Sequence, residues 1–563
     1  MILIFGGTTE GRMAVDVCEE AGKPFYYSTK SALQQVELCH GVRLSGVMTS
    51  DDILNFCHQN DIHCIVDAAH PFAENLHKTI AETGIKVIRL QRQFGDKIDG
   101  ITYCKDYEDA IQKMLHSGVQ NLLALSGANT INKLKSFWQN HHTVFRILNR
   151  EESVECAKKN GFPIDNLIFY PDSMPDVEEE KRMMSIVGCD AIITKESGET
   201  GGFEAKVKAA MALGLKVFVV EHPQLPADWI YVSGSHTLRR AIQHLVPDFF
   251  PLKTGLTTGA CATAATKAAL LSLLCDEYPE EVSFALPDGE VLTIPVECSS
   301  PGTATVEKDY SDDPDVLKGC RITSTVMPNK TGDIRFLHGD GVGTVTLPGL
   351  GIPVGDPAVN PTPRQMITNE IRALSKDGYD VRISVENGSE LALRTFNYKV
   401  GVVDGISIIG TSGIVSPLSN EAFVESIGRE LQVAKAIGCT AIGFASGKKG
   451  ENALKEAEPD LRVIHYGNFV GEALKKAHNL GFQRVVLGIM IGKAIKLADG
   501  HMDTHSHKVE LDLSKWGVTM ARQLWDVMPP SFFTEIEKNC WKHCRTVFPD
   551  GELEVRLIRD ANV

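Results

Sequence analysis

The sequence predicts an α/β fold for the first half of the chain, and an α+β region followed by a second α/β region for the other half. In the first half, short apolar runs alternate with amphipathic helical stretches, which is typical of a parallel sheet covered by helices. Residues 280–410 are rich in β-branched residues, glycine and proline, as in a sheet-rich region. From about residue 420 the alternation of helical and strand patterns returns.

The composition narrows the classes of protein to which the chain can belong. With 563 residues the chain is too long for one hydrophobic core. It has no apolar run of about 18 residues, and a strand-like run begins at Met1, so we expect neither a membrane span nor a secretory signal. The net charge of −15, without a basic stripe, argues against a nucleic-acid partner. The 14 scattered cysteines favour reduced thiols and a cytoplasmic location, and the oligomeric state stays open, a homo-oligomer included.

Eight apolar runs of the first half are expected to be strands, four in each of two Rossmann-like lobes. They are residues 2–5, 24–28, 65–68 and 86–90 in the first lobe, and 121–125, 144–147, 190–194 and 216–220 in the second. Residues 223–251 contain four prolines and one short helical pattern, so we expect the boundary between the two halves there. The expected domains are 1–246, with lobes of about 1–100 and 101–246, and 252–563, with lobes of about 252–418 and 419–563.

In the second half, a small-residue-rich pattern predicts a long helix over residues 258–274. The returning alternation predicts helices at 421–437 and 471–479 and strands at 440–445 and 484–489. These four elements would form the last lobe.

A turn rich in glycine and threonine follows the first expected strand. Glycines let the backbone approach a phosphate, hydroxyls donate hydrogen bonds, and the N-terminus of the next helix carries partial positive charge. An ordinary strand–turn–helix connection is the alternative, because the spacing is not a full Gly-x-Gly-x-x-Gly. The candidate cofactor-binding residues are Gly6, Gly7, Thr8, Thr9, Glu10, Gly11 and Arg12.

The end of the second strand indicates which dinucleotide this turn would hold. A site for NAD usually places an acidic residue there to bind the ribose 2′-hydroxyl. Here the residues are Ser28, Thr29 and Lys30, and hydroxyls with a cation suit a 2′-phosphate. NADPH is therefore favoured over NADH, and a solvent-facing loop is the alternative.

Two further segments combine polar groups with the end of an expected strand, where open α/β sheets bind ligands. One runs from Asp67 through His70 to Ala73, and the other runs from Thr194 through Lys195 to Lys206. A single histidine or lysine at such a place is often structural, so each residue alone says little.

Together these segments resemble the cobalt-precorrin-6A reductase family of cobalamin biosynthesis, over about residues 1–225. The resemblance is carried by residues 6–12, 67–73, 126–130, 145–148, 194–198 and 206–209. It implies an NADPH-dependent reduction of a macrocycle double bond, with residues 6–12 on the cofactor phosphates. Hydride transfer also needs a proton donor, and His70 and Lys195 are the two candidates. The residues expected to face the tetrapyrrole are Asp67, Phe72, Gly127, Ser197 and Gly198.

The second half opens on a hydroxyl-rich turn before the expected helix at 258–274. Thr257 and Thr258 suit an anion or carboxylate there, and ordinary helix capping by threonine is the alternative. An acidic loop holds Asp309 and Asp312, which could act as bases or lie in a solvated turn. The histidines from His501 to His507 lack a matching ligand framework, so we expect no protein-bound metal.

Longer strings resemble the cobalt-precorrin-5B C1-methyltransferase family over essentially all of residues 252–510. They are residues 339–346, 355–364, 395–397, 405–415, 468–471, 491–496 and 504–506. The resemblance implies an α+β lobe followed by a Rossmann-like lobe, and methylation of ring carbon C1 of a cobalt-bearing corrinoid with S-adenosylmethionine. Met490 departs from it, because the family tends to have histidine there.

Within this second half we assign candidate roles to three sets of residues. The loop with Gly447 and Gly450 lies between an expected strand and helix and is the candidate for S-adenosylmethionine. Asp309, Asp312 and His505 are candidates for proton removal or for orienting the macrocycle. The candidate substrate contacts are Thr257, Thr258, Arg364, Lys493 and Lys496, of which the three cations would meet substrate carboxylates.

The leading hypothesis is therefore a bifunctional enzyme of the early-cobalt, anaerobic route to cobalamin. Its C-terminal half would make cobalt-precorrin-6A, and its N-terminal half would reduce this product to cobalt-precorrin-6B. An NADPH oxidoreductase joined to a methyltransferase for another tetrapyrrole is one alternative. A corrinoid carrier without catalysis is the other.

Overall fold

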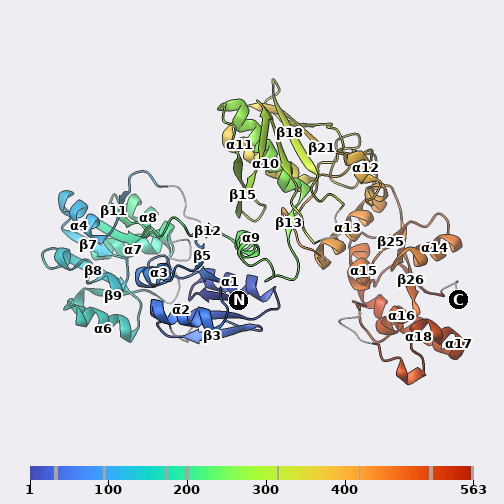
Figure 1. Cartoon of the computed structure of the whole chain (residues 1–563), viewed down its shortest axis with the longest axis horizontal. Helices are drawn as coiled ribbons and strands as arrows, with labels where there is room; N and C mark the ends of the chain where they lie inside the picture. Colours follow the sequence, from blue (N-terminus) through green and yellow to red (C-terminus); the bar gives the residue numbers. More distant parts are fainter. Residues whose placement is uncertain are drawn as a thin grey trace. The chain divides into compact units, whose positions relative to one another are not determined.

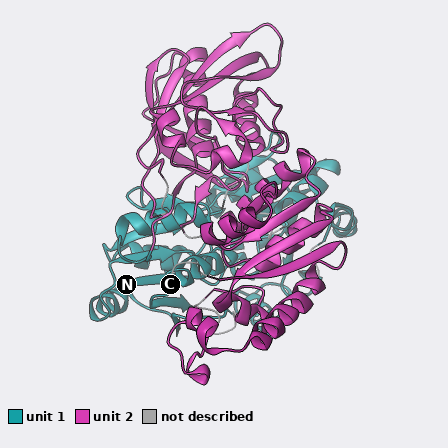
Figure 2. Cartoon of the chain, turned by 90° about the vertical axis from the view of Figure 1, so that its right-hand side faces the viewer, with its two compact units in different colours: residues 1–251 teal, residues 252–563 magenta. Residues whose placement is uncertain are grey.

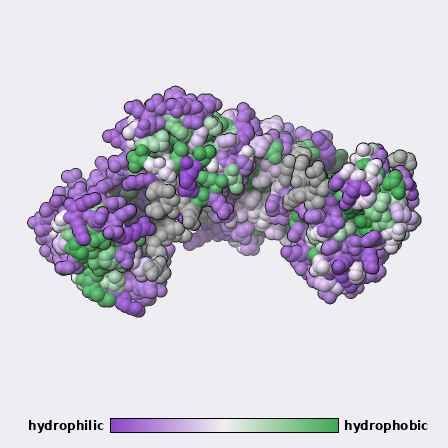
Figure 3. All heavy atoms as spheres, turned by 90° about the horizontal axis from the view of Figure 1, so that it is seen from below, coloured by the Kyte–Doolittle hydropathy of each residue, from purple (hydrophilic) through white to green (hydrophobic). Residues whose placement is uncertain are grey.

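The computed structural model describes residues 1–30, 36–92, 97–171, 175–196, 202–312, 316–417, 419–505 and 511–559. The chain forms two compact units, Met1–Pro251 and Leu252–Val563, which are coloured separately in Figure 2. Among the described residues, no helix is long and apolar enough to cross a membrane. The face seen in Figure 3 is largely hydrophilic, with hydrophobic side chains gathered in separate patches.

The first sheet of unit 1 has six parallel strands in the order β12-β5-β4-β1-β2-β3. The strands are β1 (Ile2–Phe5), β2 (Phe25–Thr29), β3 (Gly41–Ser45), β4 (Cys64–Asp67), β5 (Lys86–Leu90) and β12 (Ile230–Val232). The helices are α1 (Thr9–Glu19), α2 (Ser50–Gln59), α3 (Glu74–Ala81) and α9 (Ser235–Leu245). Every residue of β1 and β4 is buried, as expected for strands that carry helices on both faces.

The second sheet of unit 1 also has six parallel strands, in the order β6-β11-β10-β7-β8-β9. The strands are β6 (Thr102–Cys104), β7 (Asn121–Ala124), β8 (His142–Ile147), β9 (Leu167–Phe169), β10 (Ala191–Lys195) and β11 (Lys216–Val220). The helices are α4 (Tyr107–His116), η1 (Ala128–Thr130), α5 (Lys135–Trp138), α6 (Glu151–Lys159), η2 (Ile164–Asn166), α7 (Val177–Val187) and α8 (Phe203–Ala212). The expected pair of α/β lobes is confirmed for this half of the chain (Figure 1).

The change of lobe near residue 100 fits the structure, but the second lobe ends before the expected residue 246. After the second sheet the chain returns to the first, where β12 pairs in parallel with β5 and Ile230 lies opposite Ile88. Helix α9 packs on α1, and Phe249 and Phe250 join the core of the first lobe. The proline-rich segment therefore completes the first lobe instead of only linking the two halves.

Unit 2 begins with an α+β lobe built around a buried helix, α10 (Thr258–Leu274), which packs on β17, β18 and α11 (Figure 1). Its five-stranded sheet has the order β16-β17-β18-β21-β19 and is antiparallel except where β19 meets β21. These elements are β16 (Glu297–Ser300), β17 (Thr303–Glu307), β18 (Arg321–Asn329), β19 (Ile334–Leu337), α11 (Pro361–Leu374) and β21 (Gly378–Val385). Small two-stranded pairings and short helices surround it: β13 (Gly255–Leu256), β14 (Glu281–Ala285), β15 (Val291–Pro295), β20 (Thr344–Val345), α12 (Gly388–Ala392), η4 (Asn397–Val400), β22 (Val402–Val403) and β23 (Ile414–Val415).

The second lobe of unit 2 has four parallel strands in the order β25-β24-β26-β27. The strands are β24 (Ala441–Ala445), β25 (Val463–His465), β26 (Arg484–Met490) and β27 (Glu552–Ile558). The helices are α13 (Asn420–Ala436), α14 (Lys448–Ala457), α15 (Val470–Asn479), α16 (Ile491–Ala498), η5 (Ser514–Trp516), η6 (Ala521–Gln523), α17 (Leu524–Val527) and α18 (Pro530–Val547). The chain runs from β24 to β25 on one side and then to β26 on the other, so the strand order reverses at β24.

Candidate active sites

The turn after β1 is held in shape by hydrogen bonds to neighbouring strands. Thr8 caps α1, because its Oγ1 accepts from the Gly11 N–H (3.0 Å), and it donates to the Ala68 carbonyl oxygen (2.7 Å). The Gly7 N–H donates to the Tyr27 hydroxyl on β2 (3.1 Å). The turn is thus tied to the ends of β2 and β4.

The glycines of this turn leave no room for side chains on its inner face. A Cβ atom at Gly6 would lie 2.3 Å from the Tyr27 ring, and one at Gly11 would lie 2.9 Å from the Gly6 Cα atom. Gly7 has a φ of +100° and open space above it. Bare backbone at the N-terminus of α1 is what a cofactor phosphate requires.

Positive charge lies beside Tyr27 on β2, where the Arg43 guanidinium is 5.8 Å from the centroid of the Tyr27 ring. Burial raises the pKa of the Tyr27 hydroxyl, and the hydrogen bond from the Gly7 N–H and the charges of Arg43 and Arg12 act against that rise. Arg43 is on β3, where it pairs with Tyr27 in the sheet register. Ser28 and Thr29 are buried, and Lys30 is exposed. Arg43 is not predictable from the local sequence, because only the strand register brings it to this place.

Glu10 turns inward from the same turn. Its carboxylate accepts from Arg92 at 2.5 and 3.0 Å. Burial alone would raise the pKa of Glu10, but the hydrogen bonds and charge of Arg92 outweigh burial and lower it. The side chain of Glu10 therefore joins the turn to the residues after β5, and its contact with the cofactor stays a prediction.

A buried polar network supports the loop that carries His70. Asp67, at the end of β4, is fully buried, and its Oδ2 lies 3.0 Å from Arg89 Nη1 and 2.8 Å from His77 Nδ1. The other ring nitrogen of His77 donates to the His70 carbonyl oxygen (3.1 Å). This burial corrects the expectation that Asp67 faces the substrate, because the carboxylate instead holds the loop from behind.

His70 and Lys195 come from different sheets and lie close together. The Lys195 ammonium lies 5.1 Å from the centroid of the Phe72 ring, and His70 Nδ1 accepts from the Phe72 N–H (3.2 Å). Burial and the positive charges of Lys195 and Arg92 together lower the pKa of His70 to about 4, although part of the residue is exposed. Burial and the charge of Lys133 lower the pKa of Lys195. His70 is therefore neutral near pH 7.

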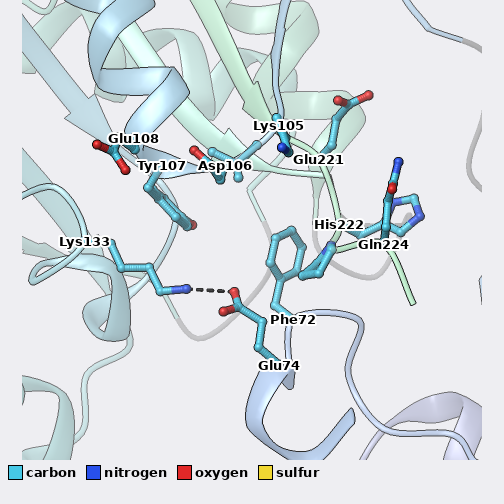
Figure 4. A pocket seen from close by; sticks show the side chains of 12 residues that line it. Phe72, Glu74, Lys105, Asp106, Tyr107, Glu108, Lys133, Glu221, His222 and Gln224 are labelled. Carbon is cyan, nitrogen blue, oxygen red and sulfur yellow. Dashed lines mark hydrogen bonds and ion pairs between the residues drawn. The ribbon is translucent and has the colours of Figure 1, made fainter. Parts of the chain in front are cut away.

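Phe72 lines a cavity of about 710 Å³ in unit 1. The walls come from the loops that follow β4, β6 and β11, including Lys105, Tyr107 and His222. Figure 4 shows Tyr107 facing Phe72 across the cavity, with Lys133 pointing to Glu74 (2.8 Å) at its edge. The cavity thus combines aromatic rings with side chains of both charges, lysines and a larger number of acidic residues, at the carboxyl ends of the strands.

The remaining residues of interest in unit 1 follow β7, β10 and β11. His222 Nδ1 lies 2.8 Å from the Glu196 carboxylate and lowers the pKa of Glu196. Gly127 has a φ of +87° after β7, and no described contact ties it to a ligand site. Ser197 and Gly198 lie outside the described residues.

In unit 2 the hydroxyl-rich turn is part of the protein core. Thr257 is 8% exposed and caps α10, because its Oγ1 accepts from the Ala260 N–H (3.2 Å). Thr258 is 2% exposed, and its Oγ1 accepts from the Ile409 N–H (2.8 Å). A Cβ at Gly410 would lie 2.2 Å from Thr257 Oγ1. These contacts correct the expectation of a substrate site and support the helix-capping alternative.

Three charged residues near this core also have structural partners. Asp309 accepts from the Leu256 N–H and Asp312 from the Lys253 N–H, both at 2.6 Å. Arg364 donates to the Val359 carbonyl oxygen (2.8 Å) and lies 3.2 Å from the Asp356 carboxylate. All three side chains thus have partners within the protein, and the expected roles of Arg364 and the two aspartates stay predictions.

The carboxyl edge of the last sheet brings three loops together at the point where the strand order reverses. Gly447 begins α14 directly after β24, a Cβ added there would have no atom within 4 Å, and Gly450 packs against Ala445. Lys493, after β26, donates to the Gly467 carbonyl oxygen (2.5 Å), after β25. Such reversal points are where open α/β sheets bind ligands. His505 is partly buried, and its N–H donates to Asp503 (3.1 Å).

Comparisons with known proteins assign both units. A family model described as Precorrin-6x reductase CbiJ/CobK matches residues 1–245, and one described as CbiD matches residues 247–417. The cobalt-precorrin-5B C(1)-methyltransferase of Prosthecochloris aestuarii (strain DSM 271 / SK 413) is 40% identical over 346 residues, covering 54% of this chain and 94% of that protein. The enzyme of the same name from Pseudomonas putida (strain GB-1) is 42% identical over 274 residues, covering 47% and 75%.

The chain is a fusion of a CbiJ/CobK unit and a CbiD unit. Solved structures that are similar to parts of this chain include a CobK precorrin-6A reductase. It has 19% identity and a TM-score of 0.35, and the match covers 44% of this chain and 97% of that one. Another is the cobalamin biosynthesis protein cbiD from Archaeoglobus fulgidus, at 27% identity and a TM-score of 0.27, covering 46% and 83%.

The close packing at Gly6 gives a test of the turn in the CbiJ/CobK unit. In Gly6→Ala the new methyl group would push the Tyr27 ring away from the Gly7 N–H, so NADPH should bind about tenfold more weakly or worse. A fluorescence titration with NADPH measures this. Gly22→Ala is the control for backbone strain, because its φ is +61° and its Cβ would meet open space. Equal affinity in Gly6→Ala and wild type would contradict the assignment.

Proposed function

We propose that the chain catalyses two consecutive steps of cobalamin biosynthesis. The CbiD unit transfers a methyl group from S-adenosylmethionine to C1 of cobalt-precorrin-5B, and the CbiJ/CobK unit reduces the resulting cobalt-precorrin-6A with NADPH. The observation that carries this proposal is the presence of both families in one chain, each matched over nearly its whole unit. In the pathway to which these families belong, the product of the CbiD step is the substrate of the CbiJ/CobK step.

The described residues of the first unit fit NADPH. Open space at Gly7 leaves room for phosphate oxygens, and the close packing at Gly6 and Gly11 keeps side chains out of the turn. Arg43 and Arg12 supply positive charge that acts on Tyr27 of β2. This charge suits the 2′-phosphate of NADPH better than the free ribose hydroxyls of NADH. When bound, NADPH supplies the hydride.

Within that reaction, Lys195 is our candidate for the proton donor. The lowered pKa of His70, about 4, leaves its ring neutral near pH 7, with Nδ1 accepting from the Phe72 backbone. Lys195 keeps an ammonium proton, and its lowered pKa makes that proton easier to release. The ring of Phe72 lies beside the ammonium and lines the cavity, and it suits the flat face of a macrocycle.

The CbiD unit offers a place for S-adenosylmethionine at the strand reversal beside β24. When bound there, S-adenosylmethionine supplies the methyl group, and the residues need mainly to align it with the nucleophilic carbon. The open backbone at Gly447 supports this placement, as does the convergence of three strand ends.

Replacing the two candidate proton donors distinguishes their roles. Lys195→Met should lower kcat for NADPH-dependent reduction of cobalt-precorrin-6A by about 100-fold or more, because no ammonium remains to protonate the product. His70→Gln should change kcat less than Lys195→Met does. In wild type, kcat should fall as the pH rises through the lowered pKa of Lys195, because only the protonated form donates.

Spectrophotometric NADPH oxidation at several pH values measures these effects. A wild-type chain that does not oxidise NADPH with cobalt-precorrin-6A would contradict the reductase assignment and favour a carrier. A Lys195→Met variant with normal kcat would contradict only the role of Lys195.

Gly447 allows a test of the methyl-donor loop that leaves the fold intact. Its backbone is extended and a Cβ would meet nothing within 4 Å, so Gly447→Leu should fold normally while its side chain fills the space above the loop. S-adenosylmethionine binding, measured by calorimetry, should weaken about tenfold or more. Gly428→Ala on α13 is the control, with only ordinary contacts to Lys476. Unchanged binding in Gly447→Leu would place the donor elsewhere.

A further inference from the structure

Two lysines of the CbiD unit, one partly buried and one buried, carry positive charge at the carboxyl edge of the last sheet. Lys493 and Lys496 lie one helical turn apart on α16, and Lys496 is only 8% exposed. The Lys493 ammonium donates to the Gly467 carbonyl oxygen (2.5 Å) and lies 5.9 Å from the centroid of the Tyr466 ring. The Lys496 ammonium donates to the Thr504 carbonyl oxygen (3.3 Å).

Neither lysine has an acidic partner among the described residues. Carbonyl oxygens accept hydrogen bonds but carry no net charge, so two neighbouring ammonium groups remain uncompensated. Burial and the charge of Lys496 both lower the pKa of Lys493, which is the electrostatic consequence of this arrangement. Two buried arginines of the chain differ: Arg146 forms a bidentate pair with Glu180, and Arg89 lies 3.0 Å from the Asp67 carboxylate.

Buried charges in proteins are normally paired or bind a ligand of opposite charge. Each ammonium has three N–H donors, and the described hydrogen bonds use one in each lysine. The remaining donors can meet an anion without breaking the contacts to Gly467 and Thr504.

The position of the pair matches a ligand site. Lys493 extends from the end of β26 to the loop after β25, and so passes the end of β24, which lies between these strands. The open loop at Gly447 begins at that same strand end. A ligand on this loop would therefore have the Lys493 ammonium beside it, with Lys496 one helical turn further along α16.

We propose that Lys493 and Lys496 form a subsite for a carboxylate of a reactant in methyl transfer. This inference rests on the proposed methyltransferase function. The carboxylate has two sources, the amino-acid end of S-adenosylmethionine or an acidic side chain of the corrinoid. Both present the same chemistry to the lysines, and the subsite neutralises their charge when it is filled.

Calorimetry with the full chain tests the subsite. The titrants are S-adenosylmethionine, its decarboxylated analogue and cobalt-precorrin-5B, and the variants are Lys493→Gln and Lys496→Gln. If the donor supplies the carboxylate, wild type should prefer S-adenosylmethionine to the analogue by about tenfold or more, and both variants should lose that preference. If the corrinoid supplies it, only corrinoid binding should weaken by that factor.

Matched variants separate charge from folding. Lys475→Gln removes an exposed lysine from α15 and should bind all three titrants as wild type does. Lys493→Arg keeps the charge and should retain more affinity than Lys493→Gln, and thermal unfolding of each variant checks its fold.

Two outcomes would reject the subsite. They differ in whether the proposed methyltransferase function is rejected with it. Variants that fold and bind every titrant as tightly as a catalytically active wild type would reject the subsite alone. A wild type that binds neither S-adenosylmethionine nor the corrinoid would reject the proposed methyltransferase function as well.

Discussion

The candidate sites of this chain depend on one constraint, namely that parallel strands end at the same edge of their sheet. In unit 1 the ends of β1, β2 and β4 bring together the glycine-rich turn, Ser28 and the His70 loop. The ends of β10 and β11 supply Lys195 and His222. In unit 2 the ends of β24, β25 and β26 do the same for Gly447, Gly467 and Lys493. Residues far apart in sequence therefore meet without any long-range motif.

Local charge acts against the charge of the whole chain at these edges. The net charge of −15 repels anionic ligands at long range, whereas Lys195 ends β10, Lys493 follows β26, and Arg43 lies opposite Tyr27 in the middle of β3. Burial increases their effect, because a charge in a low-dielectric site interacts more strongly with a ligand than one in water does. Two phosphate-bearing or carboxylate-bearing ligands can thus bind an acidic protein at defined places.

Local sequence patterns predicted much of the fold, and α10 matches its expected range of 258–274. They missed β12, because three strand residues among prolines gain their partner only through β5, far earlier in the chain. Burial caused the errors at the sites: the order of residues placed Asp67 and Thr258 next to strand and helix ends, but packing turned both side chains inward. The position of Arg43 could not be predicted from local patterns, because it approaches Tyr27 only through the register of the β2–β3 pair.

The central claim is that one chain performs both the methylation and the reduction. The most direct measurement incubates the intact chain with cobalt-precorrin-5B, S-adenosylmethionine and NADPH deuterated at the transferred position, followed by mass spectrometry of the corrinoid. A single product that has gained one methyl group and one deuterium is expected. A corrinoid that gains the methyl group without deuterium, or neither label, would contradict it.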